Sequence, residues 1–124
     1  ISLTEFEANY RHIVETITNN SELIILNIPD ATKLEIADEV QEQVSQYLIE
    51  QYGFAIDAKP LVRQYVGLYN SIIQKIANEY NLTVIDMFNY LDSLSDDLIS
   101  SDGFHPNEAG HELIADYVKE QMSK

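Results

Sequence analysis

The sequence predicts an α/β protein with a parallel sheet, and the order of its apolar segments carries this prediction. Short apolar runs at residues 23–28 and 82–88 are typical of buried strands. Longer segments with apolar residues at helical spacing lie before, between and after these two runs. Strand, helix and strand in this order favour crossover connections between parallel strands.

The first predicted helix begins close to the first residue. Thr4 and Glu7 have the spacing of a capping box, in which each side chain accepts a hydrogen bond from the other residue's backbone. Apolar residues then recur on one helical face as far as Ile17. The apolar run at residues 23–28 follows and stops at Pro29, which predicts a strand buried on both faces.

Three further helices are predicted downstream. Residues 34–52 have helical spacing, and Gly53 stands where a helix would end. Pro60 opens a longer segment with a wide apolar stripe, and Asn81 is suited to end it in the left-handed conformation. A last helix, defined by apolar residues at 113–122, follows a polar loop.

Composition excludes several classes of protein. The chain has 124 residues with 21 acidic and 7 basic side chains, a net charge of −14, so one domain fits and no nucleic-acid partner is expected. The absence of cysteine excludes disulfides, thiolate nucleophiles and sulfur-ligated zinc. No apolar window approaches the roughly 18 residues of a membrane span, and no cofactor motif is present. A bacterial cytoplasmic location and a secreted or cell-envelope location are both compatible with this composition.

The polar loop at residues 101–111 contains the constellation that points to chemistry. Asp102 precedes His105 by three residues, a spacing at which the carboxylate accepts the Nδ1 proton and leaves Nε2 as a general base. Pro106 is suited to the first turn of the next helix, which puts His105 just outside its N-terminus. Two alternatives stay open: a hydrogen bond that only staples the loop, and a metal site formed by Asp102, His105 and His111.

Residues 101–115 resemble the last block of the SGNH/GDSL hydrolase family, in which Asp-x-x-His-Pro precedes a glycine and an apolar helix. Residues 23–29 and 68–87 resemble the segments that precede this block in the family, and they occur in the family's order. The resemblance implies a flavodoxin-like three-layer α/β/α sandwich, with the two predicted strands as the fourth and fifth of its parallel sheet. It also implies a Ser-His-Asp triad in which His105 is the base and Asp102 its orienting carboxylate.

Other parts of the family pattern have no counterpart here. None of the nine serines lies in a Gly-Asp-Ser setting, and Ser101 would compete with His105 for Asp102, so it is interpreted as a loop or capping residue. Residues 1–124 are therefore interpreted as the C-terminal part of one hydrolase domain, inactive alone. We expect the intact parent to bind a small-molecule ester, and the missing N-terminal part or a second copy to cover the open sheet edge.

A hypothesis of another class is a non-enzymatic, acidic helical module that binds a partner through its tyrosines. Tyr65, Tyr69 and Tyr80 lie at helical spacing, which favours core positions over an interface. A Gly-Asp-Ser-Leu motif in the upstream coding sequence would favour the hydrolase hypothesis, and its absence would favour the module.

Overall fold

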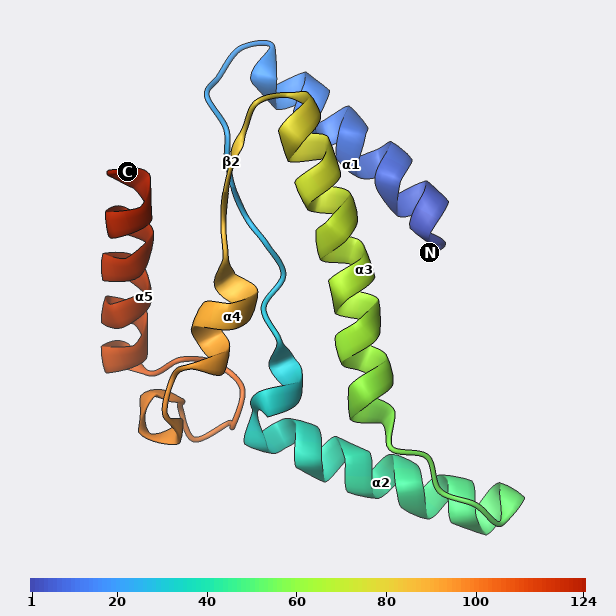
Figure 1. Cartoon of the computed structure of the whole chain (residues 1–124). Coiled ribbons are helices and arrows are strands. Elements are labelled where there is room, and N and C mark those ends of the chain that lie inside the picture. Colours follow the sequence, from blue (N-terminus) through green and yellow to red (C-terminus); the bar gives the residue numbers. More distant parts are fainter.

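A computed structural model describes all residues from Ile1 to Lys124 (Figure 1). The α-helices are α1 (Leu3–Thr18), α2 (Glu35–Tyr52), α3 (Ala58–Glu79), α4 (Met87–Asp92) and α5 (Glu108–Met122). The strands are β1 (Ile24–Leu26) and β2 (Thr83–Ile85), and two short 3-10 helices are η1 (Ala31–Lys33) and η2 (Asp96–Leu98). None of the helices combines the length and the apolar character that a membrane crossing requires.

The strands β1 and β2 form a parallel two-stranded sheet in which Ile25 is paired with Val84. The chain passes from β1 to β2 through α2 and α3. Parallel strands need a crossover of this kind because the chain must return from the C-terminal end of one strand to the opposite end of the sheet, where the next strand begins. The predicted α/β class with a parallel sheet is confirmed, although both strands are shorter than predicted.

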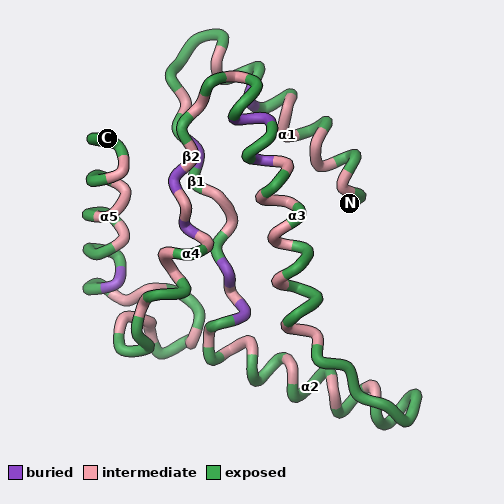
Figure 2. Tube along the Cα trace, viewed as in Figure 1, coloured by how far each residue is buried: buried purple, intermediate pink, exposed green.

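The main core lies between the sheet and the helices α1 and α3 (Figure 2). Its buried members are Val14 of α1, Ile25 of β1, and Ile73, Ile76 and Ala77 of α3. The three α3 residues share one helical face because they are spaced by three and four positions. The apolar stripe of α3 therefore holds this helix against the strands.

The prediction that the first strand is buried on both faces is wrong. Ile25 is only 4% exposed, whereas its neighbours Ile24 and Leu26 are 39% and 47% exposed. Successive residues of a strand point to opposite faces, and α1 and α3 cover only the face that contains Ile25. The outer side chains of β1 consequently remain uncovered.

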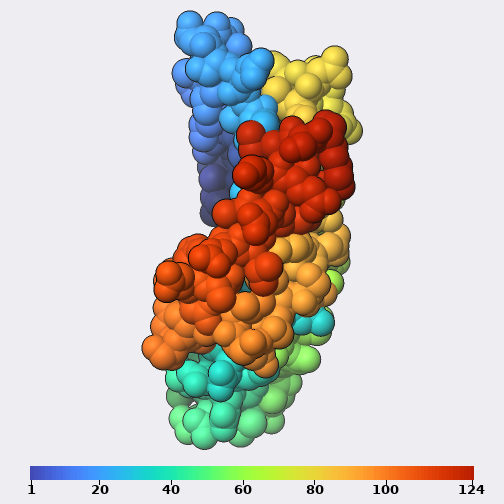
Figure 3. All heavy atoms as spheres, turned by 90° about the vertical axis from the view of Figure 1, so that its left-hand side faces the viewer, coloured from blue at the N-terminus to red at the C-terminus, as the bar shows by residue number.

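Helix α5 lies on the side of the strands away from α3 (Figures 1 and 3). The rings of Tyr90 and Tyr117 stack with centroids 3.8 Å apart, and the Tyr117 hydroxyl donates to the carbonyl of Asp86, 3.0 Å away. The Tyr90 hydroxyl donates to the carbonyl of Leu113 at 3.0 Å. These contacts join α4 and the end of β2 to α5, which follows the polar loop.

Helix α1 begins two residues earlier than predicted. The capping box is formed by Ser2 and Glu5: the Ser2 hydroxyl accepts from the Glu5 backbone at 3.1 Å, and the Glu5 carboxylate accepts from the Ser2 backbone at 2.9 Å. Ser2 and Glu5 have the same spacing as Thr4 and Glu7, and the sequence pattern alone does not choose between the two pairs. Glu7 makes tertiary contacts instead.

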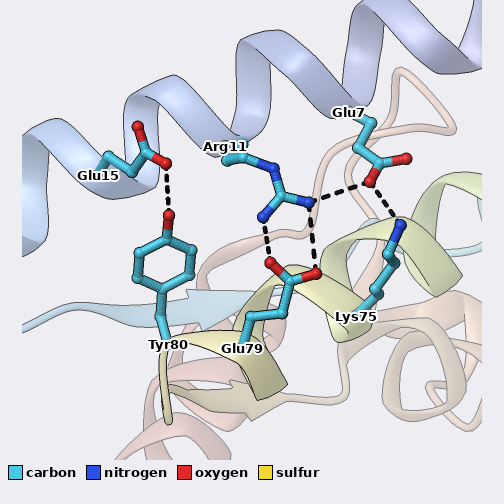
Figure 4. A network of polar contacts seen from close by, with 6 residues as sticks. All are labelled: Glu7, Arg11, Glu15, Lys75, Glu79 and Tyr80. Atoms are coloured by element: carbon cyan, nitrogen blue, oxygen red, sulfur yellow. Dashed lines mark hydrogen bonds and ion pairs between the residues drawn. The ribbon is translucent and has the colours of Figure 1, made fainter.

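Charged side chains join α1 to α3 along the rim of the core (Figure 4). Glu7 accepts from Arg11 at 3.1 Å and from Lys75 at 2.6 Å. Arg11 also pairs with Glu79, and the Tyr80 hydroxyl donates to Glu15 at 2.5 Å. Lys75, followed by Arg11, holds the pKa of Glu7 below its usual range, so this carboxylate keeps its charge.

The second strand ends at Ile85, three residues earlier than predicted. The Asp86 side chain accepts from the backbone of Asn89 at 3.2 Å and caps the short helix α4, which the sequence analysis missed. Asn27, directly after β1, accepts from the backbone of Met87 at 2.7 Å. These side chains satisfy the first donors of α4, and the chain leaves the sheet there.

The remaining helix ends agree largely with the prediction. Gly53 and Asn81 have positive φ angles of 75° and 57°, so both end their helices in the predicted left-handed conformation. Helix α3 begins behind the N-cap Asp57, which makes Pro60 its third residue rather than its first. Pro60 still lies in the first turn, where a backbone donor has no helical partner.

The three tyrosines expected in the core differ in their burial. Tyr69 and Tyr80 are half-buried, and Tyr69 packs edge-on against Phe6 with ring centroids 4.5 Å apart. Tyr65 is 58% exposed, so its predicted core position is wrong. Helix α3 covers the sheet with its C-terminal half, whereas Tyr65 lies in the half that extends beyond the core.

Candidate functional site

Asp102 and His105 lie on a tight loop between η2 and α5. Ile99 and Pro106 form an antiparallel bridge, and the backbone N–H of Ser100 donates to the carbonyl of His105 at 2.7 Å. The loop turns at Gly103, whose φ of 70° is in the region that favours glycine. A Cβ at Gly103 would lie 3.5 Å from the backbone nitrogen of Ile36, so the turn packs on the start of α2.

The two side chains have the hydrogen bond that their spacing predicts. Nδ1 of His105 lies 2.6 Å from one carboxylate oxygen of Asp102. The His105 side chain is 68% exposed and the Asp102 side chain 49% exposed. Both groups are therefore open to solvent, and no side chain forms a hydrogen bond with Nε2 of His105.

The second oxygen of Asp102 is fixed by three donors. It accepts from the Ser100 hydroxyl at 2.7 Å, from the Phe104 backbone at 2.8 Å and from the His105 backbone at 2.9 Å. The His105 imidazole, followed by the Phe104 N–H, holds the pKa of Asp102 well below its usual range. Asp102 is therefore a carboxylate of fixed orientation.

This arrangement has a clear chemical capacity. A carboxylate that accepts from Nδ1–H selects the imidazole tautomer with an unprotonated Nε2. Such an Nε2 accepts a proton from a hydroxyl and later returns it, which is general acid–base catalysis. The exposed position of His105 leaves Nε2 accessible to a reacting group.

A small apolar cavity borders His105. Its volume is about 170 Å³. Its walls come from the segment after β1, the end of α4 and the polar loop, and include Pro29, Leu34, Leu91, Leu94 and Phe104. A reacting group at His105 would therefore have apolar surface beside it.

Asn107 organises the junction between the loop and α5, a role the sequence analysis missed. Its side chain accepts from the backbone of Gly110 at 2.9 Å and donates to the carbonyl of Asp97 at 2.7 Å. Asn107 is thus the N-cap, and Pro106 precedes the helix instead of lying in its first turn. A Cβ at Gly110 would collide with the carbonyl of Leu98, so the close packing of α5 needs this glycine. An asparagine immediately before the start of a helical pattern is the signal that would have found the cap.

The structure also shows the surroundings of other polar side chains. The structure brings together no set of three or more metal-ligating side chains, so His111 does not join Asp102 and His105 in a metal site. Ser100, not Ser101, forms the hydrogen bond with Asp102. His12 is exposed on α1.

Asp30 is buried, although it lies in the loop that follows β1. Its side chain is fully buried and pairs with Arg63, whose guanidinium lies 4.9 Å from the centroid of the Phe88 ring. Asp30 also caps η1 by accepting from the backbone of Thr32 at 3.0 Å. The ion pair joins the segment after β1 to α3.

Asn70 of α3 holds the same segment through two hydrogen bonds to one residue. The Ile28 backbone N–H donates to the Asn70 carbonyl oxygen at 2.8 Å, and the Asn70 amide donates to the Ile28 carbonyl at 2.9 Å. The side chain thus replaces a strand partner just beyond β1. Asn70 lies within residues 68–87, one of the segments that resemble the hydrolase family.

Comparison with known proteins assigns the chain to a class of hydrolases. The sequence model of the GDSL-like Lipase/Acylhydrolase family matches residues 1–113. The chain therefore belongs to this family, and the resemblance seen in the sequence is confirmed.

A relative from Ruminococcus flavefaciens, a multidomain esterase, is 38% identical over 60 residues. The aligned region is 46% of this chain and 7% of that esterase, so the chain spans a small part of its relative. Membership of a hydrolase family favours the enzymatic hypothesis over the acidic helical module.

Proposed function

We propose that the chain is the C-terminal part of a GDSL-type serine esterase, lipase or acylhydrolase that hydrolyses carboxylic esters. In this proposal His105 is the general base and Asp102 its orienting carboxylate. The observation that carries the proposal is the 2.6 Å contact between Nδ1 of His105 and Asp102, with His105 open to solvent. Family membership supplies the reaction class.

The reaction needs a serine from a segment outside residues 1–124. Its hydroxyl oxygen attacks the ester carbonyl while Nε2 of His105 accepts the hydroxyl proton. The tetrahedral intermediate collapses, and His105 returns the proton to the departing alcohol. Water then attacks the acyl-serine with His105 again as base, which releases the carboxylic acid and restores the serine. Asp102 stabilises the imidazolium in both steps.

The proposal extends to the architecture of the intact domain. The two strands would be the last ones of a larger parallel sheet in a flavodoxin-like three-layer α/β/α sandwich. The exposed Ile24 and Leu26 of β1 support a further covering element. In the parent protein this cover would be the N-terminal part of the domain, which would also carry the nucleophile. A second copy is the alternative cover when residues 1–124 are alone.

The test compares the chain with a longer protein that includes a Gly-Asp-Ser segment encoded upstream. Residues 1–124 alone should not hydrolyse p-nitrophenyl acetate above the buffer rate, because the nucleophile and the oxyanion donors are missing. In the longer protein, Asp102→Asn should lower kcat by about 10⁴-fold, and His105→Ala at least as much.

The matched control is His12→Ala, which removes an exposed imidazole from α1 and should leave the rate unchanged. If residues 1–124 alone hydrolysed the ester, and if His105→Ala abolished this activity, the claim that they lack the nucleophile would be wrong. Full activity of His105→Ala in the longer protein would overturn its role as base.

A further inference from the structure

We propose that an apolar groove between α2 and the start of α3 binds the acyl chain of the ester, an inference that rests on the proposed function. The groove has a volume of about 330 Å³, near the lower end of the roughly 300–1,000 Å³ of small-molecule sites. Its apolar walls are Ile36, Val40 and Val44 of α2, Ala58 and Val62 of α3, and Phe104 of the polar loop.

The groove adjoins the site of the reaction. Phe104 and Ala31 line both the groove and the smaller cavity that borders His105. The Phe104 ring also stands edge-on to the His105 imidazole, with centroids 4.8 Å apart. When the carbonyl of an ester lies at His105, its acyl chain can therefore extend past the Phe104 ring into the groove.

One of the polar side chains that line the groove, Gln41, is already bonded within the protein. The amide nitrogen of Gln41 donates to the Ser45 hydroxyl at 2.7 Å and to the Ile56 carbonyl at 2.8 Å. Its carbonyl oxygen accepts from the Ala58 backbone at 2.7 Å. Gln41 thus ties α2 to α3 and offers little to a polar ligand.

The other two polar side chains of the groove are engaged in the same way. The Thr32 hydroxyl donates to Asp30 at 2.5 Å, and the Lys59 ammonium pairs with Asp38. An extended peptide in the groove would lack partners for its backbone groups, which is costly. A hydrocarbon chain has no such groups, so the chemistry of the walls favours it.

The net charge of the chain further restricts the kind of ligand that the groove can bind. With a net charge of −14, the protein repels anions such as a free fatty acid. A neutral ester escapes this repulsion until hydrolysis produces the acid. The groove is therefore assigned to the acyl part of a neutral ester.

Binding of neutral esters to residues 1–124 tests this assignment without any need for turnover. Methyl octanoate, added to methyl-labelled protein, should cause saturable NMR shifts at Val40, Val44 and Val62, whereas methyl acetate should not. Methyl octanoate should bind roughly fifteenfold tighter than methyl hexanoate, since each buried methylene contributes about fourfold. Val40→Gln should weaken binding by about tenfold.

The matched control is Leu61→Gln on α3. Leu61 is 49% exposed and Val40 is 52% exposed, but Leu61 does not line the groove, so its replacement should not affect binding. Equal weakening by both substitutions, or no preference for the longer ester, would overturn the assignment. A dimer in sedimentation velocity that Val40→Gln disperses would instead assign the groove to a second copy. Each of these results would leave the role of His105 intact.

Discussion

The two helices that link β1 to β2 are held in the fold in different ways. Helix α3 buries Ile73, Ile76 and Ala77 against the strands, whereas α2 has no buried residue. Burial of apolar surface is the dominant stabilising term in folding. Helix α3 is therefore fixed by the core, and α2 depends on contacts near its ends and on the hydrogen bonds of Gln41.

The loop with Asp102 and His105 resembles α2 rather than α3 in this respect. Hydrogen bonds give it its shape, and both side chains are about half or more exposed. Elements with little buried apolar surface open at lower free energy than the core. The fold thus combines a rigid base of α1, α3 and the sheet with an open half that presents the reactive groups.

The largest expected effect is the loss of unfolding free energy when a core residue of α3 is truncated. Ile76→Ala removes a side chain that is 0% exposed and should lower the free energy of unfolding by about 2–5 kcal/mol. Urea unfolding followed by circular dichroism measures it. Val40→Ala on α2, where Val40 is 52% exposed, should change it by only about 0.5 kcal/mol. Equal effects of the two substitutions would refute the contrast between the helices.

A smaller effect on the free energy of unfolding is expected at the hydrogen bonds between α3 and the segment after β1. Asn70→Ala leaves the backbone N–H and C=O of Ile28 without their partners and should cost about 1–3 kcal/mol in unfolding free energy. The same urea experiment applies, with the exposed Gln64 of α3 replaced by alanine as control. If Asn70→Ala changed the free energy of unfolding no more than the control did, the two hydrogen bonds between Asn70 and Ile28 would not contribute to stability.

The smallest expected effect on stability is the contribution of the Asp102 carboxylate, which depends on pH. A carboxyl group whose pKa is lowered by folding stabilises the native state above its ordinary pKa, here 3.8, and this contribution is lost as the pH falls through the lowered value. The ¹³C shift of the Asp102 carboxyl should therefore titrate below 3.8. Replacing Ser100 by alanine removes one donor and should raise the midpoint. A midpoint at or above 3.8 would contradict the hydrogen-bonded carboxylate.

Sequence periodicity was enough to predict the features that depend on neighbouring residues. The stripe of α3, the left-handed ends at Gly53 and Asn81, and the bond between Asp102 and His105 follow from spacings of a few positions. In each case the interacting groups are close along the chain. Their geometry is therefore fixed by local conformation.

Features that depend on distant partners were not predictable in this way. Asp30 is buried because Arg63, 33 positions away, pairs with it. The face of β1 with Ile24 and Leu26 is open because α1 and α3 cover the other face. Competing local signals explain the earlier start of α1, since Ser2 and Thr4 both satisfy the pattern of a capping residue.

The tautomer of His105 tests the central claim most directly. Two-bond ¹H–¹⁵N correlation at about pH 9, where imidazoles are neutral, distinguishes a protonated Nδ1 from a protonated Nε2. Our account predicts that His105 carries its proton on Nδ1, next to Asp102, and that Asp102→Asn removes this preference, with the exposed His12 and His111 as internal references. A proton on Nε2 of His105 in the unmodified chain would contradict it.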